Sequence, residues 1–150
     1  MRLYEVPRNR SITGRRIQEL SNISVLVVDD DEDTRDLLRE VLERSGATVV
    51  TKDSIESAIH EFRMNPSHAL VSDIRIGNSD GYTLLKAVRA INHEYMGTTA
   101  AIAVTGYASE EDRKRALSAG FSAYLPKPFD PVDVVDAIAR SLAPLLDMAA

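Results

Sequence analysis

The stretch VLVVDDDEDTRDLLRE, from Val25 to Glu40, joins an apolar run to five consecutive acidic residues and then to a helical pattern. Residues 23–28 (ISVLVV) are apolar and rich in β-branched side chains, which is typical of a short buried strand. Adjacent carboxylates repel one another, so we expect those nearest the core to face a cation. The rest of the sequence indicates which cation this is and which acids face it.

Calcium in an EF-hand loop is one candidate. Asp29, Asp31 and Asp33 occupy positions 1, 3 and 5 of such a loop, and Glu40 occupies position 12. Position 6 requires glycine for a sharp turn, however, and Thr34 stands there. An EF-hand loop also follows a helix, whereas a strand precedes these acids. Both features argue against calcium.

A solvated helix N-terminus explains part of the acidic run. Acidic side chains favour the first turn of a helix because they complement its dipole. This accounts for Glu32 and Asp33, and it can account for Asp31. It does not account for Asp29 and Asp30, which stand at the end of the strand itself.

The composition fits one globular domain of 150 residues, with 44% hydrophobic and 27% charged residues. Cysteine is absent, which excludes disulfides and thiolate metal sites. We find neither a run long enough to cross a membrane nor a signal-peptide pattern, so we expect a cytoplasmic protein without a membrane partner. The net charge of −5 argues against direct binding to nucleic acid.

The charge is uneven along the chain. Residues 1–22 carry five Arg and two Glu, whereas the remainder carries a net charge of −8. The first segment has few apolar residues, so we expect a basic flexible arm or linker, with a short helix as one option at Arg15–Leu20. A solvated tail is the simplest interpretation, and contact with an acidic partner or nucleic acid is the alternative. The folded domain is expected over residues 23–145.

The hydrophobic pattern beyond the first strand predicts strands that alternate with helices. Further strands are expected at Ala47–Thr51, Ala69–Ser72, Ala100–Val104 and Ser122–Leu125. Helices are expected at Thr34–Ser45, Ile55–Met64, Tyr82–Ile91, from a Ser109 cap to Ala119, and from an Asp130 cap to about Leu142, ending near Pro144. A turn is expected at residues 78–81. Short strands that are apolar on both faces indicate a parallel sheet covered by helices, hence a three-layer α/β sandwich.

Polar side chains follow several of these strands. Asp29 and Asp30 end the first strand, Asp73 follows the third, Thr105 follows the fourth, and Lys127 follows the fifth. Ligands of open parallel sheets bind at the carboxyl ends of the strands. The sequence therefore predicts a site that contains three carboxylates, a hydroxyl and an ammonium group.

Together these motifs resemble the receiver domain of bacterial two-component response regulators. The resemblance is carried by VLVVDDDED (Val25–Asp33), VSDIRIGNSDGYTLL (Val71–Leu85), AVTGYAS (Ala103–Ser109) and AYLPKPF (Ala123–Phe129). They occur in the order and at the spacing of the family, over residues 23 to about 142. The resemblance implies a flavodoxin-like fold with strand order 2-1-3-4-5.

The resemblance also implies a phosphoryl acceptor and a metal. Asp73 would accept the phosphoryl group from a phosphohistidine on a histidine kinase or a histidine phosphotransfer protein. Mg²⁺ would be bound directly by Asp30, Asp73 and the backbone carbonyl of Arg75, and through water by Asp29. Oxygen ligands suit Mg²⁺, which would bridge the acceptor and the phosphoryl group. The chain would be a signalling domain that catalyses only its own phosphorylation and dephosphorylation, with any kinase activity outside it.

The remaining roles concern the switch. Lys127 would pair with a phosphoryl oxygen, and Thr105 would donate a hydrogen bond to the phosphoryl group. In the family, the aromatic position of Tyr124 swings inward with that threonine, although a half-buried strand tyrosine fits the sequence equally well. The fourth helix, fifth strand and fifth helix would bind an effector or a second copy. We also expect a cis peptide bond between Lys127 and Pro128, since contacts that aim Lys127 at the acids can overcome the small trans preference.

The sequence departs from the family pattern near the acceptor. Many receivers have an apolar residue and a proline at the second and fourth positions after the acceptor, where this chain has Arg75 and Gly77. We expect a looser turn around Gly77. Tyr107, two residues after Thr105, also stands near the entrance. These changes leave the chemistry in place and leave the lifetime of the phosphoryl group open.

Two kinds of parent protein remain open. The chain ends soon after the last helix and begins with Met1, which favours a stand-alone regulator. The alternative is the C-terminal receiver of a hybrid histidine kinase in a phosphorelay, since the long segment Asn92–Thr99 resembles such receivers. A dehalogenase-type phosphatase also places an aspartate after its first strand, but residues 29–33 lack the Thr or Val that it requires. The three histidines, His60, His68 and His93, match no site.

Overall fold

The computed structural model describes residues 19–95, 97–106 and 109–149, with side chains to residue 143. Most of the expected arm at residues 1–22, most of the optional helix at Arg15–Leu20, and Tyr107 lie outside these ranges. Leu20 is fully buried, and its N–H donates to Ser45 O at 2.7 Å. Leu20, which the sequence assigned to the arm, therefore packs against the folded domain.

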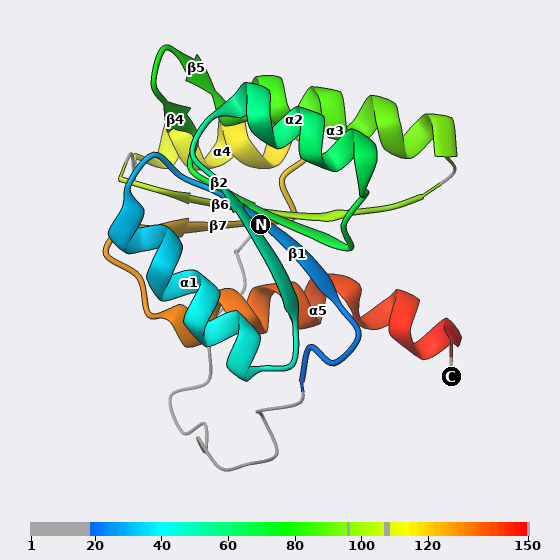
Figure 1. Ribbon diagram of the computed structural model, residues 1–150. Helices are drawn as coiled ribbons and strands as arrows, with labels where there is room; N and C mark the ends of the chain where they lie inside the picture. Colours follow the sequence, from blue (N-terminus) through cyan, green and yellow to red (C-terminus); the bar gives the residue numbers. More distant parts are fainter. Residues whose placement is uncertain (1–18, 96, 107–108, 150) are drawn as a thin grey trace.

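Five parallel strands form the central sheet (Figure 1). They are β1 (Ser24–Val28), β2 (Thr48–Lys52), β3 (Ala69–Ser72), β6 (Ala100–Thr105) and β7 (Ala123–Pro126). Their order is β2-β1-β3-β6-β7, which is 2-1-3-4-5 when only the strands of this sheet are counted. The predicted topology is confirmed.

Helices cover both faces of this sheet. They are α1 (Glu32–Arg44), α2 (Ile55–Met64), α3 (Gly81–Tyr95), α4 (Glu110–Ala119) and α5 (Pro131–Ala149). Figure 1 shows α1 and α5 on one face, and α2, α3 and α4 on the other. A hydrophobic core lies on each face of the sheet, and successive residues of β1 alternate between the two. Val25 and Val27 pack in one core, and Leu26 and Val28 pack in the other. The predicted three-layer α/β sandwich is confirmed.

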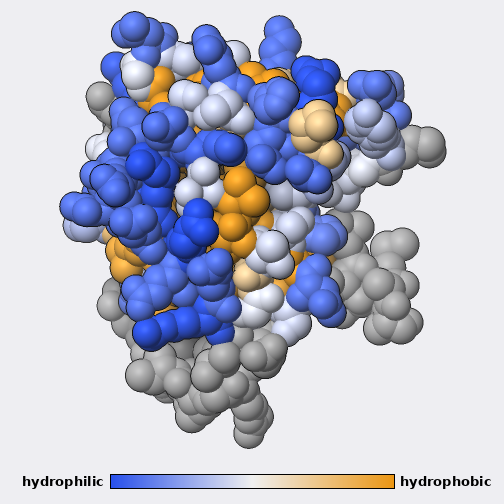
Figure 2. Space-filling model, in the orientation of Figure 1, coloured by the Kyte–Doolittle hydropathy of each residue, from blue (hydrophilic) through white to orange (hydrophobic). Residues whose placement is uncertain are grey.

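The surface seen in the orientation of Figure 1 is largely hydrophilic, and its hydrophobic areas are small (Figure 2). Among the residues whose side chains the structure describes, the exposed large hydrophobic ones are Leu37, Val50, Met64 and Tyr95. Scattered exposure of this kind is ordinary for a globular domain.

Local signals place the helix ends. Asp31 caps α1, since its side chain accepts from the backbone N–H of Thr34, so α1 begins at Glu32 rather than at Thr34. Ser109 caps α4 in the same way, by accepting from Asp112 N–H. Gly120 ends α4 with a φ of 111°, which disfavours any residue with a side chain. The expectation that the later acids of the opening stretch cap a helix is thus confirmed.

Three local predictions differ from the structure. The turn expected at residues 78–81 lies instead at residues 77–78, within an antiparallel hairpin of β4 (Arg75–Ile76) and β5 (Ser79–Asp80), where Gly77 adopts a φ of 60° and Ile76 is buried. Helix α3 continues to Tyr95 rather than ending at Ile91. Helix α5 continues past Pro144, where one backbone hydrogen bond is lost without ending the helix.

Candidate functional site

Three carboxylates meet at the carboxyl end of the sheet. Asp29 and Asp30 follow β1, and Asp73 follows the neighbouring strand β3. Each offers one oxygen, and these oxygens lie within 4.8 Å of one another. Asp29 and Asp73 are 1% and 8% exposed, whereas Asp30 is exposed. Within the described residues this is the one group of acids or histidines close enough to share a metal ion.

Lys127 supplies a positive charge to this cluster. Its Nζ lies 2.9 Å from Asp29 Oδ2 and 2.9 Å from Asp73 Oδ2. The ammonium group therefore bridges the two buried carboxylates. The sequence predicted that these residues lie at one edge of the sheet, but it did not predict this bridge. The peptide bond between Lys127 and Pro128 is cis, which confirms that prediction.

Burial and ion pairing shift the pKa values of Asp29 and Lys127 in opposite directions. Burial raises the pKa of the Asp29 carboxyl, and this outweighs the hydrogen bonds from Lys127 and from the Asp31 N–H, which lower it. For Lys127, burial lowers the pKa of the ammonium group, but the hydrogen bonds to Asp29 and Asp73 and the negative charges of these residues together outweigh burial and leave the pKa raised. Lys127 therefore stays protonated and offsets part of the repulsion between the acids.

The main chain around Asp73 is tightly packed. Ser72 Oγ donates to Asp73 O at 2.7 Å, and Arg75 N–H donates to Asp73 Oδ1 at 3.3 Å. A Cβ atom at Gly81 would lie only 2.7 Å from Asp73 O, so a glycine is required where α3 begins. The hairpin thus contacts the Asp73 carboxylate, whereas the start of α3 packs against the Asp73 main chain.

The two switch candidates lie on neighbouring strands. Thr105 ends β6, is fully buried, and accepts a hydrogen bond at its main-chain oxygen from Lys127 N–H at 2.7 Å. Tyr124 on β7 is 3% exposed, packs in the core under α4, and has no hydrogen-bond partner for its hydroxyl in the described part of the chain. Burial raises the pKa of Tyr124, and the nearby Asp112 adds to this. Tyr124 thus points inward.

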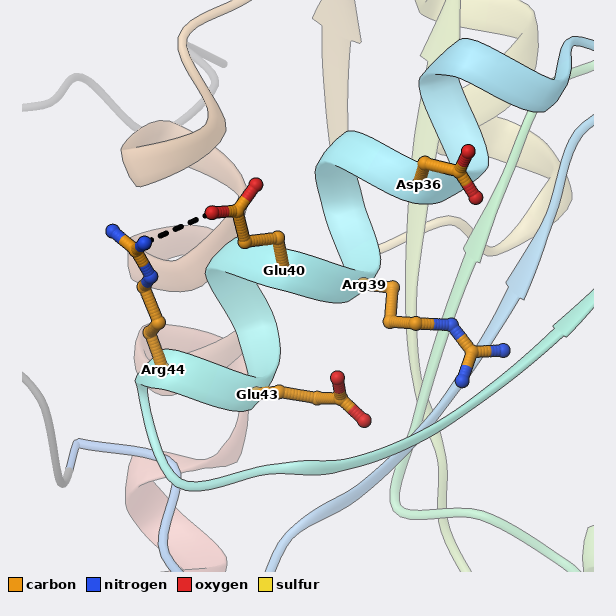
Figure 3. Close-up of a pocket in the computed structure, with 5 residues that line it drawn as sticks. All are labelled: Asp36, Arg39, Glu40, Glu43 and Arg44. Atoms are coloured by element: carbon orange, nitrogen blue, oxygen red, sulfur yellow. Dashed lines mark ion pairs between the residues drawn. The ribbon is translucent and has the colours of Figure 1, made fainter.

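A surface hollow on α1 is a separate feature (Figure 3). Its lining residues are Asp36, Arg39, Glu40, Glu43 and Arg44. Figure 3 shows that Glu40 and Arg44 turn toward each other, and their ion pair measures 2.9 Å. None of the carboxylates of the cluster lines this hollow.

In the described ranges, no helix is both long and apolar enough to cross a membrane.

Comparison with known proteins decides the family. The model of the response regulator receiver domain matches residues 25–139. The chain belongs to this family. Such receivers are signalling domains that bind Mg²⁺ at an acidic pocket, and Asp29, Asp30 and Asp73 form an acidic cluster in this one.

The relatives of this receiver differ in length. A 14.6 kDa protein from Leptolyngbya boryana is 43% identical over 79% of this chain and 89% of its own length. The two-component response regulator PprB of Pseudomonas aeruginosa is 30% identical, but this chain spans only 43% of its length. The crystal structure of a CheY-like receiver domain protein from Methanospirillum hungatei has 27% identity and a TM-score of 0.75, and the match covers 85% of this chain and 99% of that one.

Sequence reasoning missed three contributors to the site. The Arg35 guanidinium donates to Asp29 O at 2.8 Å, Gly77 N–H approaches Asp30 Oδ2 at 3.5 Å, and Gly81 packs against Asp73. The Asp80-Gly81 pair at the start of a helix was a usable signal for the last of these. The first two involve main-chain atoms, which sequence patterns do not reveal.

Proposed function

We propose that this receiver accepts a phosphoryl group on Asp73 from a phosphohistidine of a histidine kinase or a histidine phosphotransfer protein. The observation that carries the proposal is the double contact of Lys127, whose Nζ lies 2.9 Å from both Asp29 and Asp73 beside the exposed Asp30. An ammonium group between clustered carboxylates at the end of a parallel sheet suits transfer of an anionic group.

Asp73 would act as the nucleophile. A carboxylate is already ionised at neutral pH, so it needs no general base. One of its oxygens forms a bond to phosphorus while the bond from phosphorus to the histidine nitrogen breaks, and the electron pair leaves with the imidazole. The product is an acyl phosphate on Asp73 and a free histidine on the donor.

A divalent cation fits the same cluster. The donor atoms are carboxylate oxygens, which favour Mg²⁺ over softer metals. The residues that would hold it are Asp29, Asp30 and Asp73, with the main-chain carbonyl of Arg75. When bound, Mg²⁺ would supply the positive charge that lets an anionic phosphoryl group approach an anionic acceptor.

Lys127 and Thr105 would then stabilise the phosphorylated form. Lys127 can exchange its contact with Asp73 for an ion pair with a phosphoryl oxygen, and the Thr105 hydroxyl can donate to another. Because Thr105 ends β6 next to β7, a shift there reaches Tyr124 and helix α4. The output surface would be the face of α4, β7 and α5, which would bind an effector protein or a second copy of the chain.

The parent protein is a second part of the proposal. The match covers 89% of the relative from Leptolyngbya boryana but 43% of PprB, so both short and long proteins of the family resemble this chain. One proposal is a stand-alone regulator that binds a partner protein or passes the phosphoryl group to a phosphotransfer protein. The alternative is a C-terminal receiver of a hybrid histidine kinase in a phosphorelay. The full-length transcript separates the two, because a hybrid kinase would carry its kinase-coding segment in the same reading frame as this receiver.

Intact-mass spectrometry tests the chemistry. The protein is incubated with acetyl phosphate, once with Mg²⁺ and once with the metal chelated. We expect a mass gain of one phosphoryl group in the presence of Mg²⁺ and none with the chelator. No gain at any Mg²⁺ concentration, with acetyl phosphate or with a phosphorylated histidine phosphotransfer protein, would overturn the proposal.

A further inference from the structure

Arg35 makes an unusual contact for a helix surface residue. It lies in the first turn of α1 and is half-buried, and its guanidinium donates to the main-chain oxygen of Asp29 at 2.8 Å. That oxygen belongs to the planar peptide unit that joins Asp29 to Asp30. A bond to it therefore limits the rotation of the plane from which Asp30 projects.

The two acids that share this peptide are held very differently. The Asp29 carboxylate accepts from Asp31 N–H at 2.9 Å and from Lys127 at 2.9 Å, and Asp29 N–H donates to Lys52 O at 3.2 Å. The Asp30 carboxylate is exposed, and its one hydrogen bond within the described residues is from Gly77 N–H at 3.5 Å. That distance is too long for a strong bond. The orientation of the Asp30 carboxylate thus depends mainly on the conformation of the main chain at residues 29–30.

A guanidinium group at this place has two opposite effects on a cation. Its charge repels a metal ion, which weakens binding. Its hydrogen bond keeps the Asp30 carboxylate turned toward Asp73. This strengthens metal binding, because the carboxylate then loses less conformational freedom when the ion binds. The sign of the change when Arg35 is replaced therefore separates the two effects.

We propose that Arg35 is a positioning residue for the metal site, and that it acts through the Asp29 carbonyl to aim the Asp30 carboxylate at Asp73. The inference rests on the proposed function, because it assumes that Asp30 and Asp73 share a cation. The carboxylate of Asp29 is paired with Lys127, so the contribution of Arg35 is orientation of the main chain rather than neutralisation of that carboxylate.

Arg39 provides a matched control one turn later on α1. Its guanidinium donates to Thr51 Oγ1 of β2 at 3.0 Å. Arg35→Met and Arg39→Met remove the same charge from the same helix, and both introduce a good helix former. Arg35→Lys keeps the positive charge but replaces the planar guanidinium group, with its several N–H donors, by a single ammonium group.

The test measures the Mg²⁺ dissociation constant by isothermal titration calorimetry for the unaltered protein and the three variants. We expect Arg35→Met to weaken Mg²⁺ binding by about 10-fold, as loss of a residue that orients a ligand does. Arg35→Lys should fall between this variant and the unaltered protein, and Arg39→Met should bind no more weakly than the unaltered protein. With acetyl phosphate, Arg35→Met should need more Mg²⁺ for half-maximal labelling and reach the same rate at saturating Mg²⁺.

Two results would overturn the inference. Tighter Mg²⁺ binding by Arg35→Met would show that Arg35 acts only as a repelling charge, and unchanged binding would show that its contact is only structural. If Arg35→Met fails to fold without metal, Arg35→Lys alone decides, and equal affinity to the unaltered protein contradicts the proposal. Failure of the unaltered protein to bind Mg²⁺ would instead overturn the proposed function itself.

Discussion

Lys127 and Asp73 lie 54 residues apart in the sequence, and their side chains meet at 2.9 Å between Nζ and Oδ2. The contact forms because β3 and β7 flank β6 and end at the same edge of the sheet. A second contact of the same length joins Lys127 to Asp29. One ammonium group thus contacts two buried carboxylates and offsets part of their repulsion.

Replacing Lys127 with methionine should destabilise the metal-free protein. Asp29 and Asp73 would then face each other without a counter-charge, and two charge-assisted hydrogen bonds would be lost. We expect a loss of about 1.5–3 kcal/mol in the free energy of unfolding, reduced by the partial exposure of the ammonium group. Urea denaturation with the metal chelated measures it, and Lys86→Met on the exposed side of α3 is the control. Equal stability of the two variants would contradict the argument.

Replacing Asp29 with asparagine should have a pH-dependent effect on the metal-free protein. Burial raises the pKa of Asp29, so the native state binds its proton more tightly than the unfolded chain does. The stability from this group is fully present below the unfolded pKa and is lost as pH rises through the raised native pKa. Asp29→Asn should therefore raise the melting temperature at pH 7, and this gain should shrink toward pH 4.

Thermal melts between pH 4 and 7.5, with the metal chelated, check this expectation. Asp53→Asn, at an exposed position after β2, controls for the loss of one negative charge. The explanation by burial would fail if the effect of Asp29→Asn were the same at every pH, or if the control reproduced it.

Magnesium should raise the melting temperature of the unaltered protein, because it binds the native cluster and not the unfolded chain. At a concentration 100-fold above the dissociation constant, the stabilisation should be about 2.7 kcal/mol. Asp30→Asn should remove most of it, since a neutral amide is a poor ligand for Mg²⁺. Asp36→Asn, at an exposed position on α1, should keep the full response. An unchanged Mg²⁺ response in Asp30→Asn would place the metal elsewhere.

Thr105→Ala should separate phosphorylation from its consequence. Driving a resting active population of about 1% to near completion requires roughly 5.5 kcal/mol of preference for the active state. The hydroxyl of Thr105 and the ammonium group of Lys127 are the proposed sources of that preference. The variant should still be phosphorylated on Asp73, but beryllofluoride should cause smaller amide chemical shift changes across residues 109–142.

Nuclear magnetic resonance spectra with and without beryllofluoride measure these changes. Thr48→Ala, at an exposed position on the edge strand β2, is the control and should respond like the unaltered protein. If Thr105→Ala shows the full shifts, the link to the α4–β7–α5 face runs elsewhere, and Arg75 and Tyr107 become the next candidates.

The sheet and most of the site could be predicted from the sequence because their signals are local and strong. Strands such as residues 24–28 are apolar on both faces, and the topology of a parallel sheet brings their carboxyl ends together. That argument placed Asp29, Asp73 and Lys127 on one edge, where the structure shows them in contact.

The remaining features depend on interactions that no periodic pattern reveals. The hairpin β4–β5 has two residues in each strand, too few for a period, and it depends on Gly77 and on the burial of Ile76. Helix α3 gains its last turn where Asn92 donates to Thr99 Oγ1 at 3.0 Å, a contact with the chain that follows. The bond from Arg35 to a main-chain oxygen was equally hidden, since α1 carries three arginines and no periodic pattern distinguishes Arg35 from the others.

The most direct test of the central claim locates the phosphoryl group. The protein is labelled with acetyl phosphate and Mg²⁺, and the acyl phosphate is reduced with borohydride, which converts the phosphorylated aspartate to homoserine. Peptide mass spectrometry then identifies the residue. We predict homoserine at position 73 alone, and no mass gain in Asp73→Asn. Homoserine at position 29 or 30, or full labelling of Asp73→Asn, would contradict the assignment of Asp73 as the acceptor.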